Sequence, residues 1–327
     1  MLLSELVEAS AEITATSSRK LKTDVVARVL RAATDDEVAI VAAYLAGTPR
    51  QRRTGLGWRG LEVLPPAVDD PSLTIVEVDA LLERLGSVSG AGSRAARARL
   101  VEELFGRATA AEQAFLRALV FENLRQGAQD SVLLDGIARA AGVPPPAVRR
   151  AAMFSPSSGE VAAAALGGGK EALARFGLVP GRPVRPMLAA AAPDVSAAMT
   201  TAGAGTPGVP VLVDRKLDGI RVQVHRTGPD VRVFTRSLDD VTDRLPEVVE
   251  AARSLEVDTV VLDGEVLALH PDGRPRPFQE TGSRTASSAD LEEQRRRTPL
   301  TAYFFDVLHL DGRDLVDADG RTRLELL

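Results

Sequence analysis

The sequence predicts a multidomain protein, with an all-α region over residues 1–178, a linker or arm over 179–209 and an α+β domain over 210–327. Three observations predict this fold class. The chain has 327 residues, which is enough for two ordinary hydrophobic cores. Apolar residues recur with a helical period as far as about position 180. Beyond that point, runs of β-branched and aromatic residues replace the helical pattern.

The helical region contains two capping boxes, in which a cap threonine is followed three residues later by a glutamate. They pair Thr34 with Glu37 and Thr109 with Glu112. An apolar face follows each box: Val38, Val41, Tyr44 and Leu45 after the first, and Phe115, Leu116, Leu119 and Val120 after the second. The first of these helices is predicted to end at Gly47.

The composition of the chain changes after the predicted helices. Residues 179–209 are rich in Pro, Gly and Ala, as is typical of a linker or an extended arm. Strand-like runs follow at 209–217, 220–226, 231–237, 259–269 and 301–310, and a helix is predicted over 245–255. Pro229 and Asp230 fit a hairpin turn between the second and third runs. An α+β domain is therefore predicted after the arm.

Composition narrows the class of protein. Hydrophobic residues make up 45% and charged residues 26%, and no apolar run of about 18 residues predicts a membrane span. The N-terminus does not resemble a signal peptide, so we expect a cytoplasmic protein with no membrane partner. The absence of cysteine excludes disulfides and cysteine-ligated zinc, and with three histidines a metal would be oxygen-bound, such as Mg²⁺. The net charge of −5 argues against a strongly basic nucleic-acid binder overall, although local patches decide such contacts.

The stretch VLVDRKLDGIRVQVHR at 211–226 is the first candidate site. Asp214, Lys216 and Asp218 alternate, so on a strand their side chains would share one face, and Gly219 would permit a tight turn and close approach of a ligand. A lysine amine is nucleophilic only when neutral, a form that desolvation or nearby cations favour. We therefore expect Lys216 to act as a nucleophile mainly when a metal ion and a polyphosphate are bound beside it. From spacing alone, a solvated strand end with an Asp-Gly turn is the more frequent explanation.

Four motifs in order resemble those of the covalent nucleotidyltransferases, which comprise DNA ligases, RNA ligases and mRNA capping enzymes. They are K-x-D-G followed by an arginine at 216–221, FTRS at 234–237, VLDGEVLAL at 261–269 and AYFFDVLHLDGRDL at 302–315. PFQE at 277–280 also resembles a segment of ATP-dependent DNA ligases. One such motif would be a weak signal, whereas four in the family's order are a strong one.

The first half of the chain separates the members of this superfamily. RQRRTGLGW at 50–58, the run at 119–143 and GRPVRPMLA at 181–189 resemble the helical DNA-binding domain and interdomain arm of ATP-dependent DNA ligases. Capping enzymes and NAD-dependent ligases do not carry this domain. The resemblance implies a helical DNA-binding domain over 1–178 and the N-terminal part of an adenylation (nucleotidyltransferase) domain over 210–327.

The resemblance also implies roles for individual residues. Lys216 would be the catalytic nucleophile that forms a lysyl-AMP intermediate with ATP in the presence of Mg²⁺. Nucleotide contacts would come from Asp214, Arg221, Arg236, Glu265 and Phe305. Phe305, chosen over Phe304 by its place before Asp306, would stack on adenine, although both phenylalanines could be core residues. Glu265 would contact ribose or metal. Taken singly, Arg236 would more often be a solvated strand residue and Glu265 an exposed one.

Local basic residues are the candidates for contact with DNA. Arg50, Arg52 and Arg53 form a basic loop, and Arg125 lies near a helix end, where backbone amides can also meet phosphate. Such residues would hold a duplex by its phosphates without reading sequence. A solvated basic loop is an equally frequent explanation for each.

Residues 130–153 also fit a helix-turn-helix, the DNA-binding motif of many transcription factors. Its second helix would offer Val148, Ala151 and Ala152 to a major groove, with Arg149 and Arg150 as its only polar readers.

The resemblance stops before the family pattern is complete. After AYFFDVLHL the family continues with another glutamate, paired lysines and an OB-fold domain, none of which occurs in these residues. We therefore expect a fragment of a longer ligase, incomplete within the adenylation domain, that seals nicks poorly or not at all. The alternatives are a catalytically deficient DNA-binding fragment, or an RNA ligase or capping-type nucleotidyltransferase.

The same resemblance implies nicked duplex DNA as the partner, with a sliding clamp as a further candidate. It also implies a monomer associated with the nucleoid, acting in DNA replication, repair or recombination.

Overall fold

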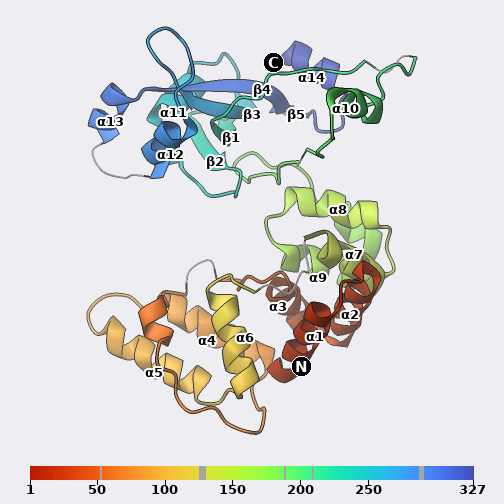
Figure 1. Cartoon of the computed structure of the whole chain (residues 1–327), viewed down its shortest axis with the longest axis vertical. Coiled ribbons are helices and arrows are strands. Elements are labelled where there is room, and N and C mark those ends of the chain that lie inside the picture. Colours follow the sequence, from red (N-terminus) through yellow and green to blue (C-terminus); the bar gives the residue numbers. More distant parts are fainter. Residues whose placement is uncertain (52–53, 125–129, 188, 208–209, 287–290) are drawn as a thin grey trace. The chain divides into compact units, whose positions relative to one another are not determined.

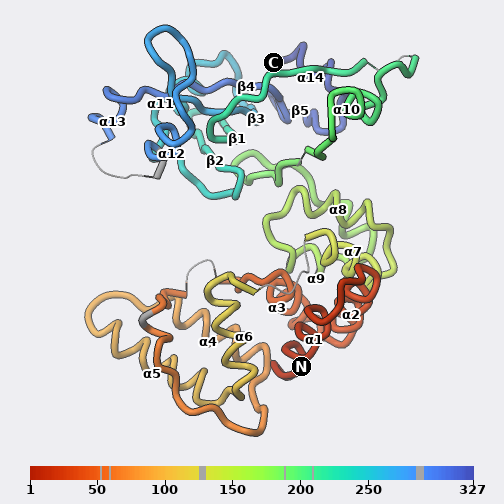
Figure 2. Tube along the Cα trace, viewed as in Figure 1, coloured from red at the N-terminus to blue at the C-terminus, as the bar shows by residue number. Residues whose placement is uncertain are grey.

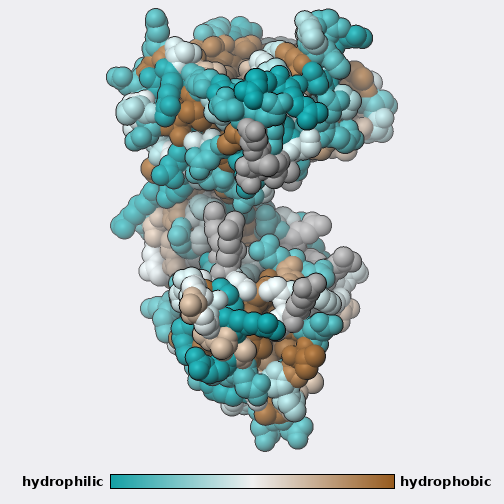
Figure 3. Space-filling model, turned by 90° about the vertical axis from the view of Figure 1, so that its left-hand side faces the viewer, coloured by the Kyte–Doolittle hydropathy of each residue, from teal (hydrophilic) through white to brown (hydrophobic). Residues whose placement is uncertain are grey.

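The computed structural model describes residues 1–51, 54–124, 130–187, 189–207, 210–286 and 291–327. It divides into two compact units, Met1–Gly177 and Leu178–Leu327. Within the described ranges, no helix is both long and apolar enough to cross a membrane. Figure 3 shows one face of the molecule, on which apolar residues form small patches separated by hydrophilic ones.

The first unit is helical (Figure 1). Its elements are α1 (Leu3–Ala15), α2 (Arg19–Ala32), α3 (Asp35–Leu45), the short 3-10 helix η1 (Trp58–Leu61), α4 (Ile75–Ser87), α5 (Ser93–Phe105), α6 (Ala110–Val120), α7 (Asp130–Ala141), α8 (Pro145–Phe154) and α9 (Ser158–Leu173). The predicted all-α class of this region is confirmed.

The predicted capping boxes lie at the starts of α3 and α6. At α6 both halves form: the Thr109 N–H donates to Glu112 at 2.8 Å, and the Glu112 N–H donates to Thr109 Oγ1 at 3.3 Å. At α3 the Thr34 N–H donates to Glu37 at 2.9 Å, while the threonine hydroxyl donates to Asp36. Helix α3 ends at Leu45, and Gly47 follows with a φ of 82°, a left-handed conformation that glycine adopts without strain.

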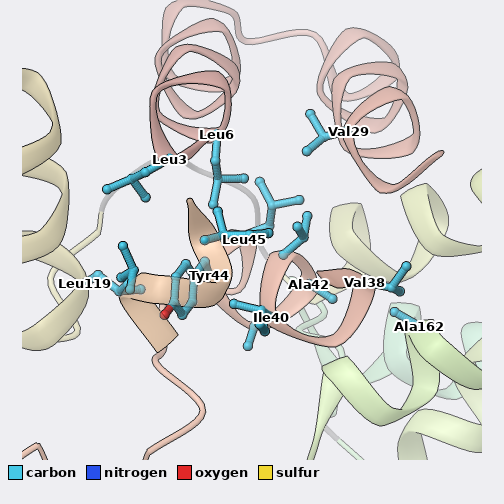
Figure 4. Close-up of a cluster of buried hydrophobic side chains, with 14 of the residues drawn as sticks. Leu3, Leu6, Val29, Val38, Ile40, Ala42, Tyr44, Leu45, Leu119 and Ala162 are labelled. Atoms are coloured by element: carbon cyan, nitrogen blue, oxygen red, sulfur yellow. The ribbon is translucent and has the colours of Figure 1, made fainter. Parts of the chain in front are cut away.

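The core of this unit forms around α3. Figure 4 shows Leu3 and Leu6 of α1, Tyr44 and Leu45 of α3, and Leu119 of α6 in one buried cluster. All five side chains are 0–1% exposed. Because α3 contributes buried residues on most of its surface, it is enclosed by the other helices and does not simply lie on them.

The second unit contains α10 (Val195–Thr201), β1 (Ile220–Thr227), β2 (Asp230–Thr235), the 3-10 helix η2 (Thr242–Arg244), α11 (Pro246–Arg253), β3 (Thr259–Ala268), α12 (Phe278–Ala286), α13 (Leu291–Arg297), β4 (Leu300–Leu310), β5 (Arg313–Asp314) and α14 (Gly320–Leu326). The strands form one antiparallel sheet in the order β2-β1-β3-β4-β5. Side chains from α11 pack with one face of this sheet in the second hydrophobic core. The predicted α+β class is confirmed.

Two sequence expectations in this unit are wrong in detail. The run 209–217 was expected to be a strand, but residues 210–218 form no strand, and Leu212 and Val213 are exposed. A strand is stabilised by hydrogen bonds to a neighbouring strand, and no described strand pairs with this segment. The hairpin turn between β1 and β2 consists of Gly228 and Pro229, because Asp230 already pairs with Thr227.

Candidate functional site

The candidate site lies on the face of the sheet opposite α11. Side chains alternate along a strand, so every second residue of β1, β3 and β4 points to this face. The residues that form it are Arg221, Gln223 and His225 of β1, Asp263 and Glu265 of β3, and Tyr303 and Phe305 of β4. In the strand register, Arg221 lies opposite Glu265, and Glu265 lies opposite Tyr303.

Arg221 is held in a fixed position on this face. Its guanidinium donates to both oxygens of Asp263, from Nε at 3.0 Å and from Nη2 at 2.6 Å, and a third nitrogen donates to the Met187 carbonyl at 3.4 Å. The same group lies 5.7 Å from the centre of the Phe305 ring. The hydrogen bonds to Asp263 raise the pKa of Arg221. Arg221 therefore presents a permanent positive charge over an aromatic face.

Glu265 lies beside this pair. One of its oxygens accepts from the Gly219 N–H at 3.0 Å, which ties the K-x-D-G segment to β3. Partial burial raises the pKa of Glu265, and the Gly219 N–H and the charges of Lys216 and Arg221 oppose that rise. Among the described residues no hydrogen bond engages its second oxygen, which can therefore meet a ligand hydroxyl or a metal ion.

Lys216 lies near this carboxylate but outside the sheet. Its side chain is 86% exposed, and its amine lies 3.5 Å from Asp218. The amine is therefore open to solvent, and among the described residues it has an exposed carboxylate as its ion-pair partner. Asp214 is also exposed, and its carboxylate accepts from the Arg215 N–H at 2.7 Å.

The structure shows why position 219 is occupied by glycine in this fold. Its φ does not lie in the left-handed region, so no turn requires glycine there. A Cβ at this position would lie 2.2 Å from the Val266 carbonyl oxygen of β3. The absence of a side chain therefore allows close approach by a neighbouring strand of the protein, and the predicted close approach by a ligand stays a prediction. Gly264 has the same role against the Tyr303 carbonyl, at 2.5 Å.

The two phenylalanines of β4 have different environments. Phe304 packs against the core that α11 covers. Phe305 is on the opposite face, where it is partly exposed and contacts Arg221. Tyr303 is a second exposed aromatic residue on this face.

Arg236 is exposed in the turn after β2, and within the described part of the chain no hydrogen bond or ion pair joins it to the other site residues. The turn is braced by its neighbours. The Thr235 N–H donates to the Asp239 carbonyl at 2.9 Å, and the Ser237 hydroxyl donates to the Asp239 carboxylate at 2.5 Å. Leu238 adopts a φ of 69°, which is uncommon for a residue with a side chain. The guanidinium of Arg236 is therefore exposed on a well-defined turn.

The arm before β1 is attached to the same face of the sheet. Buried Gln223 accepts from the Val184 N–H at 2.9 Å and donates to the Val184 carbonyl. The ring of His225 accepts from the Gly181 N–H at 3.1 Å, and burial, with a smaller effect of His309, lowers the pKa of His225 to about 4. With the Arg221–Met187 contact, three alternate residues of β1 bind successive points of the arm. In Figure 2 the arm and the segment that leads to β1 appear as a mostly extended green trace interrupted by α10.

Sequence reasoning missed four residues of this face: Asp263, Gln223, His225 and Tyr303. Asp263 had a detectable signal, because it stands two residues before Glu265 on an alternating strand and must share its face. Gln223 and His225 had no such signal. A glutamine or histidine on a strand is commonly solvated, and their buried state depends on the arm folding back over them.

The donor atoms on this face suit a shared magnesium ion better than a protein-held metal centre. In the part of the chain that the structure describes, no group of three or more His, Asp and Glu side chains could hold a metal ion. Both oxygens of Asp263 are engaged by Arg221. Mg²⁺ is often bound by one or two carboxylates together with substrate phosphates. Glu265 fits that pattern.

Of the predicted DNA contacts, Arg50 alone can be placed. Its guanidinium lies 3.3 Å from Asp79, and its side chain is half exposed. Gln51 donates to the Asp79 carboxylate at 3.2 Å, so Asp79 anchors this part of the loop. Arg52, Arg53 and Arg125 lie outside the described residues.

The helix-turn-helix alternative is not supported by the packing of α7 and α8. Val148, Ala151 and Ala152, which would face a major groove, are 0–2% exposed within the core. Arg149 pairs with Asp135 at 2.5 Å, and Arg150 lies over the Phe154 ring at 5.5 Å. The second helix therefore uses its apolar face for folding and has none left to enter a groove.

The chain is similar in sequence to known proteins. Residues 186–327 match a family model described as ATP dependent DNA ligase domain, and residues 59–138 match one described as DNA ligase N terminus. A protein named probable DNA ligase from Nocardioides sp. is 55% identical over 332 residues, covering 100% of this chain and 63% of that protein. Another of the same name from Beutenbergia cavernae is 55% identical over 333 residues, covering 100% and 64%. The chain thus spans just under two thirds of the length of these curated relatives.

A solved structure titled Pmar-Lig_Pre supports the fold alone. It superposes with a TM-score of 0.52 at 14% identity, covering 98% of this chain and 61% of that one. Both ligase family models match in the expected order, and relatives at 55% identity extend along the whole chain. On these grounds, the chain belongs to the ATP-dependent DNA ligase family.

Proposed function

We propose that the chain carries the DNA-binding and nucleotide-activating functions of an ATP-dependent DNA ligase, with Lys216 as the nucleophile. The observation that carries this proposal is the register of the sheet. It places Arg221 opposite Glu265 and over Phe305, while the Gly219 N–H holds the Lys216 segment against Glu265. Nucleotidyl transfer needs a nucleophile, a fixed cation and a platform for the base in one place, and these residues can supply all three.

In the proposed reaction the neutral amine of Lys216 attacks the α-phosphorus of ATP. A P–N bond forms, the bond to the β-phosphate breaks, pyrophosphate leaves and the amine proton passes to solvent. AMP is then transferred to the 5′ phosphate of a nick, which releases the lysine. The 3′ hydroxyl attacks that phosphorus, AMP leaves and the strand is sealed. Mg²⁺, when bound, would neutralise phosphate charge.

The other residues of the face have proposed roles in binding and orientation. Phe305 would stack on adenine, and Arg221, oriented by Asp263, would bind phosphate. Glu265 would contact the ribose or share a magnesium ion with the phosphates. Asp214, or its backbone, would face the adenine edge. Arg236 would reach the nucleotide or the phosphate of the nick. Because Lys216 is exposed in this structure, we expect the bound nucleotide and metal to supply the charge environment that its attack requires.

The helical unit is the proposed duplex-binding part. Arg50, Arg52, Arg53 and Arg125 would hold phosphates of a nicked duplex without reading sequence. A monomer would suffice for this reaction, since every proposed group comes from one chain. A sliding clamp remains a candidate recruiting partner, and association with the nucleoid would follow from binding DNA.

The test is the covalent adduct. We expect mass spectrometry, after incubation with ATP and Mg²⁺, to find AMP on Lys216 and Lys216→Arg to lose it. The matched variant Lys170→Arg, changed in a helix of the first unit, should keep it. An adduct on another residue, or none with any nucleotide, would refute Lys216 as the nucleophile.

Two further comparisons set the substrate class. Labelling by GTP in place of ATP would favour a capping-type enzyme, and sealing of nicked RNA over nicked DNA would favour an RNA ligase. We expect labelling by ATP, and sealing of nicked DNA in preference to nicked RNA; the reverse preference would contradict a DNA ligase.

A further inference from the structure

Trp58, the only tryptophan of the chain, is displayed on the surface of the helical unit. It opens the short 3-10 helix η1, and its side chain is 64% exposed. Leu61, at the other end of the same turn, is fully buried in the core. The turn is therefore anchored while the indole stays in solvent. A large exposed aromatic side chain is informative, because burial of its apolar surface would otherwise stabilise the fold.

The last turn of α6 holds the indole in place. The ring of Phe121 lies 5.3 Å from the indole, centre to centre, at an interplanar angle of 39°. The guanidinium carbon of Arg117 lies 5.5 Å from the indole centre, within the range of a cation–π contact. Phe121 caps α6 by donating its N–H to the Arg117 carbonyl at 3.1 Å. Trp58 is thus fixed by two residues of one helix end and needs little ordering to bind a partner.

Arg117 supplies a positive charge in direct contact with Trp58. Arg117 forms no ion pair with any residue in the described ranges. The side chain of Arg97 packs against the backbone of Gly55, where a Cβ would lie 2.9 Å from Nε. Arg50 begins the same loop. Arg117 therefore places a cation against one exposed aromatic ring, and Arg97 contacts Gly55 of the loop that precedes it, an arrangement complementary to a polyanion with apolar sugar and base edges.

We propose that Trp58 and Arg117 form a contact for duplex DNA, in which the indole packs on a sugar or base edge and the guanidinium binds the adjacent phosphate. This inference rests on the proposed function and adds two residues to its DNA-binding surface. The occupant is proposed to be the duplex because the charged group that contacts the indole, the Arg117 guanidinium, is cationic. A protein partner docking on the same ring is the competing occupant.

The single tryptophan makes a direct test possible. The full chain is titrated with nicked and intact duplexes, and tryptophan emission is recorded beside the anisotropy of a fluorescein-labelled duplex. We expect emission to change in a saturable manner along the anisotropy curve. Trp58→Ala should weaken binding about tenfold, as loss of an aromatic contact does. Arg117→Gln should weaken it several-fold and reduce the salt slope by roughly one.

Matched variants and separate readouts keep the outcomes distinct. Arg84→Gln, which removes an exposed arginine paired with Glu103, should bind as the parent does. Trp58→Phe should retain most of the affinity, and it replaces Trp58→Ala if that variant does not fold. If the duplex binds by anisotropy while emission and the Trp58 variants show no change, another partner uses this ring and the inference is overturned. If no duplex binds even at low salt, the proposed function itself is overturned.

Discussion

The Lys216 segment and the β1–β3 strand pair meet at Gly219, yet the structure holds them in very different ways. Residues 210–218 pair with no described strand, and Lys216 is exposed. A few residues later, Arg221 makes a bidentate ion pair with Asp263 on a sheet whose strands are paired along their length. The comparison shows that the groups proposed to bind the nucleotide are positioned by the fold. The proposed nucleophile is attached to them mainly through one backbone hydrogen bond, from Gly219 to Glu265.

Gly219, where these two regions meet, should be the position at which a substitution lowers stability most. In Gly219→Ala the new methyl group would meet the Val266 carbonyl oxygen, 2.2 Å from its ideal position. A backbone atom cannot move aside as a flexible side chain can, so we expect the free energy of unfolding of the second unit to fall by about 4 kcal/mol. Chemical denaturation measures this change.

The matched control is Gly282→Ala within α12, where the nearest contacts are at ordinary distances of 3.7–3.8 Å. Alanine there should stabilise the helix by about 0.5–1 kcal/mol. Equal effects of the two substitutions would show that Gly219 does not need to lack a side chain.

The arm attached to the strand pair should be released by acid. The pKa of His225 is lowered by burial from 6.5 to about 4, so the folded state binds fewer protons than the unfolded state between these values. The stability that depends on neutral His225 is fully present above pH 6.5 and is lost as the pH falls toward 4. We expect the loss to reach roughly 3 kcal/mol.

The measurement compares unfolding of the parent and of His225→Gln at pH 7 and pH 4. The difference in stability between them should shrink, or reverse, at the lower pH. Exposed His270 supplies the control, and His270→Gln should follow the parent at both values. A parent and a His225 variant with the same pH dependence would disprove the prediction.

Breaking the Arg221–Asp263 ion pair should lower the free energy of unfolding by a smaller amount, because Arg221 retains some solvent contact. Asp263→Asn keeps the shape of the side chain but leaves the guanidinium without a carboxylate partner. We expect a loss of about 2 kcal/mol in the free energy of unfolding, and a larger effect on nucleotide binding because Arg221 loses its orientation.

Isothermal titration with ATP and denaturant unfolding separate these two effects. Asp272→Asn removes an exposed carboxylate that pairs with Arg274 in the same unit, and it should change neither quantity measurably. If Asp263→Asn binds ATP as the parent does, Arg221 does not need this partner.

The smallest effect on stability is expected at the proposed nucleophile itself. Lys216→Gln removes an exposed amine whose nearest partner, Asp218, is also exposed. The free energy of unfolding should stay within about 0.5 kcal/mol of the parent. A loss comparable to that of Asp263→Asn would mean that Lys216 is part of the folded framework, and the contrast between the two regions would disappear.

Much of the fold could be predicted because its signals are local. The alternation of β1, β3 and β4 and the capping box of α6 depend on residues close in sequence. The prediction of a strand at 209–217 was wrong because it rested on a local signal alone. VPVLVDRKL has the right alternation, but a strand also needs a hydrogen-bonding neighbour, and none of the described strands provides one.

The sequence by itself determined the chemical groups and their order: the lysine before an Asp-Gly pair, the carboxylates of β3 and the aromatic residues of β4. The tertiary structure alone decided that Arg221 pairs with Asp263, that Phe305 and not Phe304 faces it, and that the arm is tied to Gln223 and His225. The reason is physical. Side-chain alternation depends on residues that are close in sequence. Partners such as Arg221 and Asp263 lie 42 positions apart and are brought together only by the strand register.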